Sequence, residues 1–147
     1  MRIAMAADHG GFHLKEALKA ALSVQGHEVV DWGTHDAEMV DYVDFAVPAA
    51  QAVASGECER GILCCGTGLG VMLTANKVRG IRAVVCHDCY SARMSRRHND
   101  ANVLCLGGRV HGAGLAEEIA RIWLETPFEG GRHARRVAKI MALEGSR

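Results

Sequence analysis

The sequence predicts an α/β fold, a single doubly wound, Rossmann-like domain with a five-stranded parallel sheet flanked by helices. Short apolar runs alternate along the chain with longer segments whose apolar residues recur at helical spacing. The short runs are continuously apolar, as expected of strands that are covered on both faces. Alternating strands and helices imply parallel pairing through right-handed crossovers.

The first half of the chain supplies two strands and two helices. Residues 2–7 form the first apolar run, and residues 12–22 follow with helical spacing before Gly26, a typical helix stop. Residues 27–31 are the second strand, with Glu28-Val29-Val30 at its centre. After a polar connection at 34–40, residues 42–54 are rich in Ala and Val at helical spacing.

The second half repeats this alternation. Strands are expected at residues 61–65, 81–86 and 102–106, and helices at 71–78, 90–97, 113–124 and 132–144. No linker, internal repeat or low-complexity tract interrupts the chain. Residues 1–147 are therefore expected to form one domain, which is an ordinary size for one.

Composition excludes several functional classes. The formal net charge is +0, which argues against a protein that neutralises nucleic-acid phosphates. No apolar run approaches the roughly 20 residues that span a bilayer, and the N-terminus lacks the features of a signal peptide. The six cysteines lie mostly in strand-like segments, which favours reduced thiols in a cytoplasmic protein.

Ligands of doubly wound folds bind outside the carboxyl ends of the strands. The turn after the third strand, Gly66-Thr67-Gly68-Leu69-Gly70, has three alternate glycines and precedes a helix, an arrangement that suits an anion. It lacks the Lys-Ser/Thr of nucleotide hydrolases, and Val71 replaces the third glycine of dinucleotide-binding proteins. The alternative is a tight turn whose glycines serve packing.

Cys65 ends the third strand directly before this turn. The following helix terminus favours a thiolate there, so Cys65 is a candidate base or nucleophile. The alternative is a small buried hydrophobe. Cys64 provides an internal comparison, because neighbouring residues on a strand face opposite sides.

Asp8-His9 follows the first strand and places an acid and an imidazole at the expected ligand edge. The alternative is a helix cap with a surface histidine. His98-Asn99 lies at the end of the helix expected at 90–97, where histidine suits proton transfer. A helix C-cap is the alternative there.

Arg132 and Arg136 are four residues apart and so share one helix face. Together with Arg109, which follows the fifth strand, these guanidinium groups suit a phosphate. His133 and Arg135 are expected on other faces. A solvated basic helix is the alternative.

Cys86 and Cys89 form a single Cys-x-x-Cys. No second pair stands at zinc spacing, and a redox pair would need a thioredoxin-like context. An incidental helix start is favoured over metal or redox chemistry.

Taken together, these motifs resemble the family of ribose-5-phosphate isomerase B and the galactose-6-phosphate isomerase subunits. The resemblance covers nearly the whole chain, and its order and spacing are specific. It rests on Asp8-His9-Gly10-Gly11-Phe12, Asp41-Tyr42, Cys65 to Gly70, Ala75-Asn76-Lys77, Gly80-Ile81-Arg82-Ala83, His98-Asn99-Asp100-Ala101-Asn102-Val103, Gly108-Arg109-Val110 and Gly130-Gly131-Arg132-His133.

The resemblance implies a role for each matching residue. Cys65 would move the proton, the backbone N–H groups from Gly66 to Gly70 would hold the enediolate oxygens, and His98, with Thr67, would open the sugar ring. Asp8 and Tyr42 would lie near the sugar hydroxyls. His9, Arg132 and Arg136 would bind phosphate, and Asn99 and Arg109 would reach into a neighbouring subunit's site.

The implied protein is an aldose–ketose isomerase of a sugar phosphate, without metal or organic cofactor, working as a homodimer or homotetramer. One family branch uses a glutamate base and lacks the cysteine, whereas Cys65 implies the cysteine version. Val43 replaces the proline that many relatives have after Asp-Tyr, which affects only the role of Tyr42. The alternatives are an isomerase of allose 6-phosphate, galactose 6-phosphate or a tetrose phosphate, and, in another class, a flavodoxin-like nucleotide-binding module.

Overall fold

The computed structural model describes residues 1–146, and strands alternate with helices as expected. The strands are β1 (Arg2–Ala7), β2 (Glu28–Asp31), β3 (Arg60–Cys65), β4 (Ala83–Val85) and β5 (Val103–Gly107). The helices are α1 (Phe12–Val24), α2 (Tyr42–Ala54), α3 (Leu69–Ala75), α4 (Cys89–Asn99), α5 (Ala113–Glu125) and α6 (Arg132–Ala142), followed by a 3-10 turn, Leu143–Ser146. None of the described helices is both long enough and apolar enough to cross a bilayer.

The five strands form one parallel sheet in the order β2-β1-β3-β5-β4, which confirms the predicted fold class. β5 therefore lies between β3 and β4. Cys65 at the end of β3 is opposite Gly107 at the end of β5. This register brings the turns that follow these two strands side by side.

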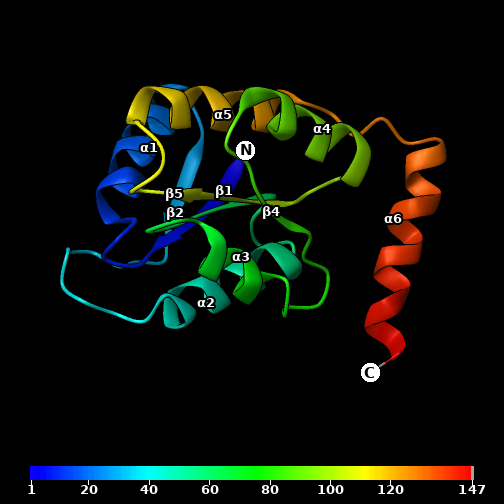
Figure 1. Cartoon of the computed structure of the whole chain (residues 1–147), viewed down its shortest axis with the longest axis horizontal. Coiled ribbons are helices and arrows are strands. Elements are labelled where there is room, and N and C mark those ends of the chain that lie inside the picture. Colours follow the sequence, from blue (N-terminus) through cyan, green and yellow to red (C-terminus); the bar gives the residue numbers. More distant parts are fainter. Residues whose placement is uncertain (147) are drawn as a thin grey trace.

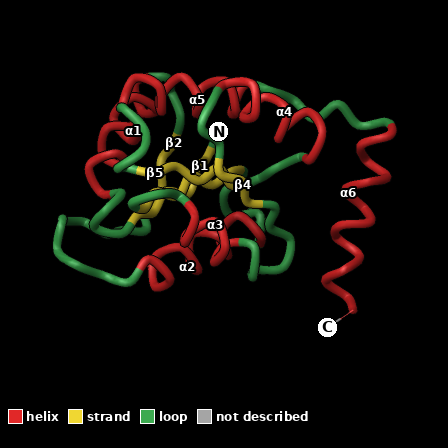
Figure 2. The backbone as a smooth tube through the Cα atoms, in the orientation of Figure 1, coloured by secondary structure: helices red, strands yellow, loops and turns green. Residues whose placement is uncertain are grey.

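Helices cover both faces of the sheet, with α1, α4 and α5 on one side and α2 and α3 on the other (Figures 1 and 2). Consecutive residues of β3 take part in different cores, as alternation along a strand requires. Ile62 and Cys64 pack with α1 and α5, whereas Leu63 and Cys65 pack with α2 and α3. Burial on both faces explains why the strands are continuously apolar.

Helix α6 stands apart from the two layers (Figure 1). His133 is the one buried residue among those of α6. Ile140 is 47% exposed, and Leu143 just after the helix is 65% exposed. The apolar side of α6 is therefore uncovered within one chain.

The boundaries of α3 and α4 differ from the sequence prediction. α3 begins at Leu69 rather than Val71, because Gly68 has a φ of 83° and lets the chain turn directly into the helix. Leu69 and Gly70 are thus helical. α4 continues to Asn99, so His98 and Asn99 belong to its last turn, and Asp100 ends it in a left-handed conformation.

The fourth strand is shorter than expected, at three residues rather than six. The side chain of Asn102 accepts the N–H of Arg82 at 2.8 Å, and that of Asn76 accepts the N–H of Ala83 at 2.9 Å. These side chains satisfy the backbone N–H groups at the start of the edge strand β4.

Candidate active site

Three turns meet at the carboxyl edge of the sheet, and they fit only because they contain glycine. A side chain on Gly10 would lie 3.0 Å from the backbone nitrogen of Gly66, and one on Gly108 would lie 2.3 Å from the carbonyl oxygen of Gly10. A side chain on Gly107 would lie 2.7 Å from the backbone of Thr67. The turns after β1, β3 and β5 are therefore packed backbone against backbone.

Hydrogen bonds hold this arrangement in place. The N–H of Gly108 donates to the carbonyl of Cys65 at 2.8 Å, and the N–H of Arg109 donates to the carbonyl of Gly66 at 3.0 Å. The turn after β5 thus supports the glycine loop that follows β3.

Cys65 lies at the centre of this group and is 4% exposed. Its Sγ accepts the N–H of Gly68 at 3.1 Å. A backbone donor pointing at the sulfur is the contact that a thiolate base would use. The N–H of the next residue, Leu69, donates to Oγ1 of Thr67 at 3.3 Å.

Cys64 lies on the opposite face of β3 and is fully buried. Burial raises the pKa of its thiol to about 12. Cys64 therefore remains a neutral thiol in the apolar core, and the prediction that the two cysteines face opposite sides is confirmed.

Asp8 and His9 follow β1 at this edge, and Tyr42 lies against the glycine loop. Asp8 is buried, and its Oδ1 accepts the N–H of Gly11 at 3.0 Å. His9 Nδ1 accepts the N–H of Val40 at 3.3 Å. The Tyr42 ring lies over Gly70, where a side chain would come within 2.7 Å of its Cζ.

Arg109 lies against the glycine loop of its own chain. A side chain on Gly66 would lie 3.2 Å from Nη1 of Arg109. The expected role of Arg109 in a neighbouring subunit's site stays a prediction. Its guanidinium brings a positive charge to the edge at which an anionic substrate would bind.

His98, Asn99 and Arg132 form a second group elsewhere in the chain. The ring of His98 stacks on that of His133, with centroids 4.2 Å apart and planes 9° apart. His98 Nε2 is 4.0 Å from a carboxylate oxygen of Glu129.

His133 was not among the predicted site residues. It is 4% exposed, and Nε of Arg132 lies 3.5 Å from its Nε2. Burial, followed by the nearby charges of His98 and Arg132, lowers the pKa of His133. It lies on a different helix face from exposed Arg132 and Arg136, as expected, and its spacing from Val137 and Ile140 places it on the apolar stripe of α6.

The two groups lie at opposite ends of the parallel strands: the Cys65 group at the carboxyl ends and the His98 group towards the amino ends. α4 returns the chain to the amino ends of the strands, where the carbonyl of Asn102 accepts the N–H of Gly61. Cys65 is four residues further along β3, which corresponds to roughly 13 Å at the rise of a strand. One chain alone therefore does not bring His98 to Cys65.

The chain matches the family model described as Ribose/Galactose Isomerase over residues 3–140. It belongs to that family. Ribose-5-phosphate isomerase B of Escherichia coli is 51% identical to this isomerase over 146 residues, which cover 99% of this chain and 98% of the relative. D-erythrulose-4-phosphate isomerase of Pectobacterium atrosepticum is 45% identical, with 95% of this chain and 93% of the relative covered.

The structure agrees with these relationships. Ribose-5-phosphate isomerase B of Clostridium thermocellum superimposes with a TM-score of 0.98 at 55% identity, and the match covers 99% of both chains. The resemblance inferred from the motifs is therefore confirmed. The protein is an aldose–ketose isomerase with this family's fold.

For this isomerase, the predicted site residues fall into two sets. Asp8, His9, Tyr42, Cys65, the loop from Gly66 to Gly70 and Arg109 gather at the carboxyl edge. His98, Asn99 and Arg132 lie with α4 and α6, and Arg136 is one turn further along α6.

One group of side chains in the described part of the chain has donor atoms close enough for a metal ion. These atoms, from His98, Glu129 and His133, lie within 4.8 Å of one another. Arg97 pairs with Glu129 at 3.0 Å, and Arg132 contacts His133. Two adjacent guanidinium groups favour an anion over a cation at this place.

Cys86 and Cys89 are not part of that group. Cys89 is the first residue of α4, and the side chain of Asp88 caps the helix by accepting the N–H of Ser91 at 2.7 Å. Burial raises the pKa of the Cys86 thiol. These observations are consistent with a Cys-x-x-Cys spacing that arises only because a helix begins there.

Proposed function

We propose that the isomerase interconverts D-ribose 5-phosphate and D-ribulose 5-phosphate, with Cys65 as the base. The observation that carries this assignment is the Gly68 N–H pointing at the Cys65 sulfur, at the end of a strand and inside a glycine loop. In this mechanism the Cys65 thiolate removes the proton from C2 of the aldose. The same thiol then returns a proton to C1, while the hydroxyl proton of O2 passes to O1.

The enediolate formed between these steps carries negative charge on its oxygens. Backbone N–H groups of the loop from Gly66 to Gly70 would bind them, and such a donor is typically worth about 3–4 kcal/mol in the transition state. Electrons move only within the substrate, so the reaction needs no redox partner or organic cofactor.

The remaining residues would prepare the substrate. Ribose 5-phosphate is mainly a furanose, and His98 with Thr67 would open its ring by proton transfer. Asp8 and Tyr42 would contact the hydroxyls. His9, Arg132 and Arg136 would hold the phosphate, whose binding energy positions the reacting carbons.

A site of this composition requires a second subunit, because His98 and Cys65 lie at opposite edges of one chain. We therefore propose a homodimer, able to pair into a tetramer, in which α4 and α6 of one subunit complete the carboxyl-edge site of the other. The uncovered apolar side of α6 supports this arrangement, since such helix faces normally pack against another surface. All six cysteines are free, which fits the cytoplasm as the place of the reaction.

The proposal is tested by measuring kcat/KM over a panel of aldose phosphates in heavy water. Ribose 5-phosphate should give the highest value, and solvent deuterium should enter C1 of ribulose 5-phosphate through the exchanging base. The tetrose phosphates are the second candidate, because one relative at 45% identity is named a D-erythrulose-4-phosphate isomerase. A higher kcat/KM for a tetrose phosphate would replace the proposed substrate. Absence of deuterium from C1 would argue against proton transfer through solvent-exchanging Cys65.

A further inference from the structure

The last turn of α4, which carries His98 and Asn99, ends in an unusual backbone conformation. Asp100 has φ 47° and ψ 42°, the left-handed region that residues other than glycine rarely adopt. Its N–H nevertheless donates to the carbonyl of Arg96 at 3.1 Å, as in a regular left-handed helix end. A residue in this conformation persists only where its surroundings hold it.

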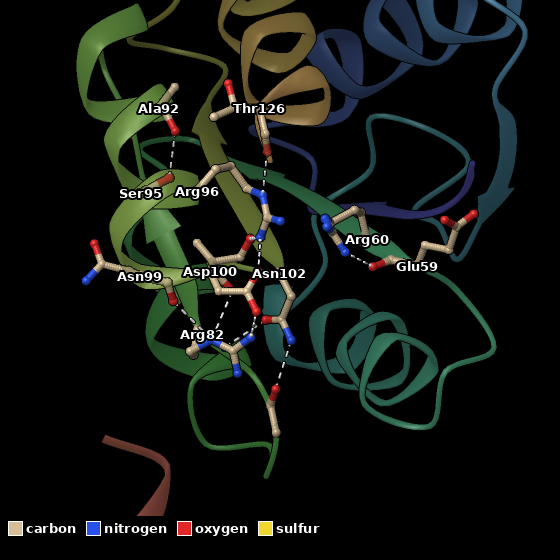
Figure 3. Close-up of polar contacts among 12 residues, drawn as sticks. Glu59, Arg60, Arg82, Ala92, Ser95, Arg96, Asn99, Asp100, Asn102 and Thr126 are labelled. Carbon is tan, nitrogen blue, oxygen red and sulfur yellow. Dashed lines mark hydrogen bonds and ion pairs between the residues drawn. The ribbon is translucent and has the colours of Figure 1, made fainter. Parts of the chain in front are cut away.

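Two arginines hold Asp100 through its carboxylate (Figure 3). Nη1 of Arg96 donates to Oδ1 at 2.8 Å, and Nη2 of Arg82 donates to Oδ2 at 3.1 Å. Nε of Arg82 also donates to the backbone carbonyls of Asp100 at 2.9 Å and of Asn99 at 3.2 Å. The carboxylate and the last carbonyls of α4 are thus fixed together.

The arginines are themselves anchored to other elements. Arg96 is 2% exposed, and its guanidinium donates to the carbonyls of Ala101 at 2.5 Å and Thr126 at 3.3 Å. The guanidinium also lies 5.8 Å from the ring centroid of Trp123 in α5. Arg82 precedes β4, and its Nη1 lies 3.4 Å from Sδ of Met141 in α6. The end of α4 is therefore tied to α5, to the edge of the sheet and to α6.

We propose that Asp100, held by Arg82 and Arg96, is a positioning residue that sets the place of His98 and Asn99. This inference rests on the proposed function, in which these two side chains complete a neighbouring subunit's site. Helix ends fray when their carbonyls lack partners. The bonds from Arg82 and Arg96 prevent this directly after His98, so its ring keeps the stacked contact with His133.

The experiment compares two substitutions at Asp100 in the full-length protein. Asp100→Gly tolerates the left-handed backbone but removes the carboxylate. Asp100→Asn tolerates it too and keeps an acceptor for one of the two guanidinium groups. Asp88→Ala is the matched control, because it removes the cap at the opposite end of the same helix.

Two readouts separate positioning from stability. The first is kcat and KM for ribose 5-phosphate. The second is the NMR signal of the His98 ring, assigned by its loss in His98→Gln, which senses the ring current of stacked His133. Asp100→Gly should lower kcat roughly 10- to 100-fold with little change in KM, as a displaced catalytic group does, and should shift the His98 signal. Asp100→Asn should also lower kcat and shift the His98 signal, but its loss in kcat should be smaller.

Asp88→Ala should lower the melting temperature while kcat and the His98 signal stay unchanged. An unmoved His98 signal with wild-type kcat in Asp100→Gly would overturn the inference, and so would an equal loss of kcat in Asp88→Ala. If Asp100→Gly does not fold, Asp100→Asn serves as the test. A wild-type kcat and an unshifted His98 signal in Asp100→Asn would then refute the positioning role of Asp100. A wild-type protein inactive on every sugar phosphate would instead refute the proposed function, while the NMR comparison would still test the placement of His98.

Discussion

Cys64 and Cys65 are adjacent in sequence but have opposite environments. Cys65 accepts a backbone hydrogen bond from Gly68 at the edge where three turns meet. Cys64 points into the apolar core, where burial raises its pKa to about 12. The difference follows from strand geometry, since consecutive side chains leave a strand on opposite faces.

This contrast gives a prediction for paired substitutions. Cys65→Ala should lose roughly 10²–10⁴-fold in kcat with its fold intact, the usual effect of removing an acid–base group. Cys64→Ala should keep most of its kcat and lose only stability, because it removes a buried sulfur. Steady-state kinetics and thermal unfolding of both variants check this.

Chemical modification provides an independent check on the same pair. Iodoacetamide should inactivate the wild type, and ribose 5-phosphate should protect it. Full activity of Cys65→Ala with an inactive Cys64→Ala would reverse the assignment. Full activity of both would exclude a cysteine base.

A cluster of ion pairs attaches helix α1 to strand β2. Nζ of Lys15, fully buried, donates to both oxygens of Asp31 at 2.7 Å, and Lys19 contacts the same carboxylate at 2.6 Å. Burial by itself would raise the pKa of Asp31, but the bonds from Lys15, Lys19 and the Gly33 N–H outweigh it and bring the pKa to about 2.

A pH dependence of stability follows from this shift. The folded-state pKa of Asp31 lies below its ordinary value of 3.8, so its contribution is complete above about pH 4 and is lost as the pH falls towards 2. Asp31→Asn should destabilise the protein by about 2 kcal/mol at neutral pH, because buried Lys15 would keep only the carboxylate of Glu16, at 2.8 Å, as its counter-ion. The difference from wild type should shrink below pH 4.

Denaturant unfolding between pH 7 and 2 measures this difference. Glu125→Gln is a suitable control, since Glu125 forms an exposed ion pair with Arg121 at 2.8 Å and should change stability by less than about 1 kcal/mol. A gap between Asp31→Asn and wild type that stays constant down to pH 2 would contradict the role given to Asp31.

Helix α6 offers a test of the phosphate assignment. Arg132→Ala and Arg136→Ala should each raise KM for ribose 5-phosphate strongly and also lower kcat, because phosphate binding energy is used in the transition state. Arg135→Ala, on another face of the helix, should have little effect. Equal damage from all three variants would show that α6 itself was disturbed.

At the scale of the whole molecule, the central feature is the separation of the two residue groups. The carboxyl-edge group contains Cys65, whereas His98 lies with α6 at the opposite edge. Each subunit would therefore contribute half of each site in the proposed dimer.

Mixing inactive subunits tests this arrangement. His98→Ala and Cys65→Ala proteins should each be inactive, but after exchange a mixed dimer has one site with both native residues. Up to about half of the mixed dimers' sites should then recover activity, because each site takes its two residues from different subunits. Proven exchange, for example by mass spectrometry of differently tagged subunits, without recovered activity would rule out shared sites.

Local patterns in the sequence were enough to predict the fold class and the position of Cys65 beside the glycine loop of the candidate site. Apolar periodicity distinguishes strands from helices locally, and continuous apolar strands imply a sheet covered on both faces. The glycine loop and Cys65 are neighbours in the chain, so their proximity needs no tertiary information. The start of α3 and the end of α4 each differ from the prediction by two residues, next to Gly68 and Asp100 in left-handed conformations, and β4 is three residues shorter than expected.

Which residues far apart in the chain meet depends on long-range packing. The insertion of β5 between β3 and β4 brings Arg109 over Gly66 of its own chain, and strand order depends on long-range pairing that local patterns do not encode. Likewise, the stacking of His133 on His98 depends on how α6 leaves the domain. The placement of His98 and Cys65 at opposite edges follows from the return path of α4, a property of the crossover connection rather than of either residue.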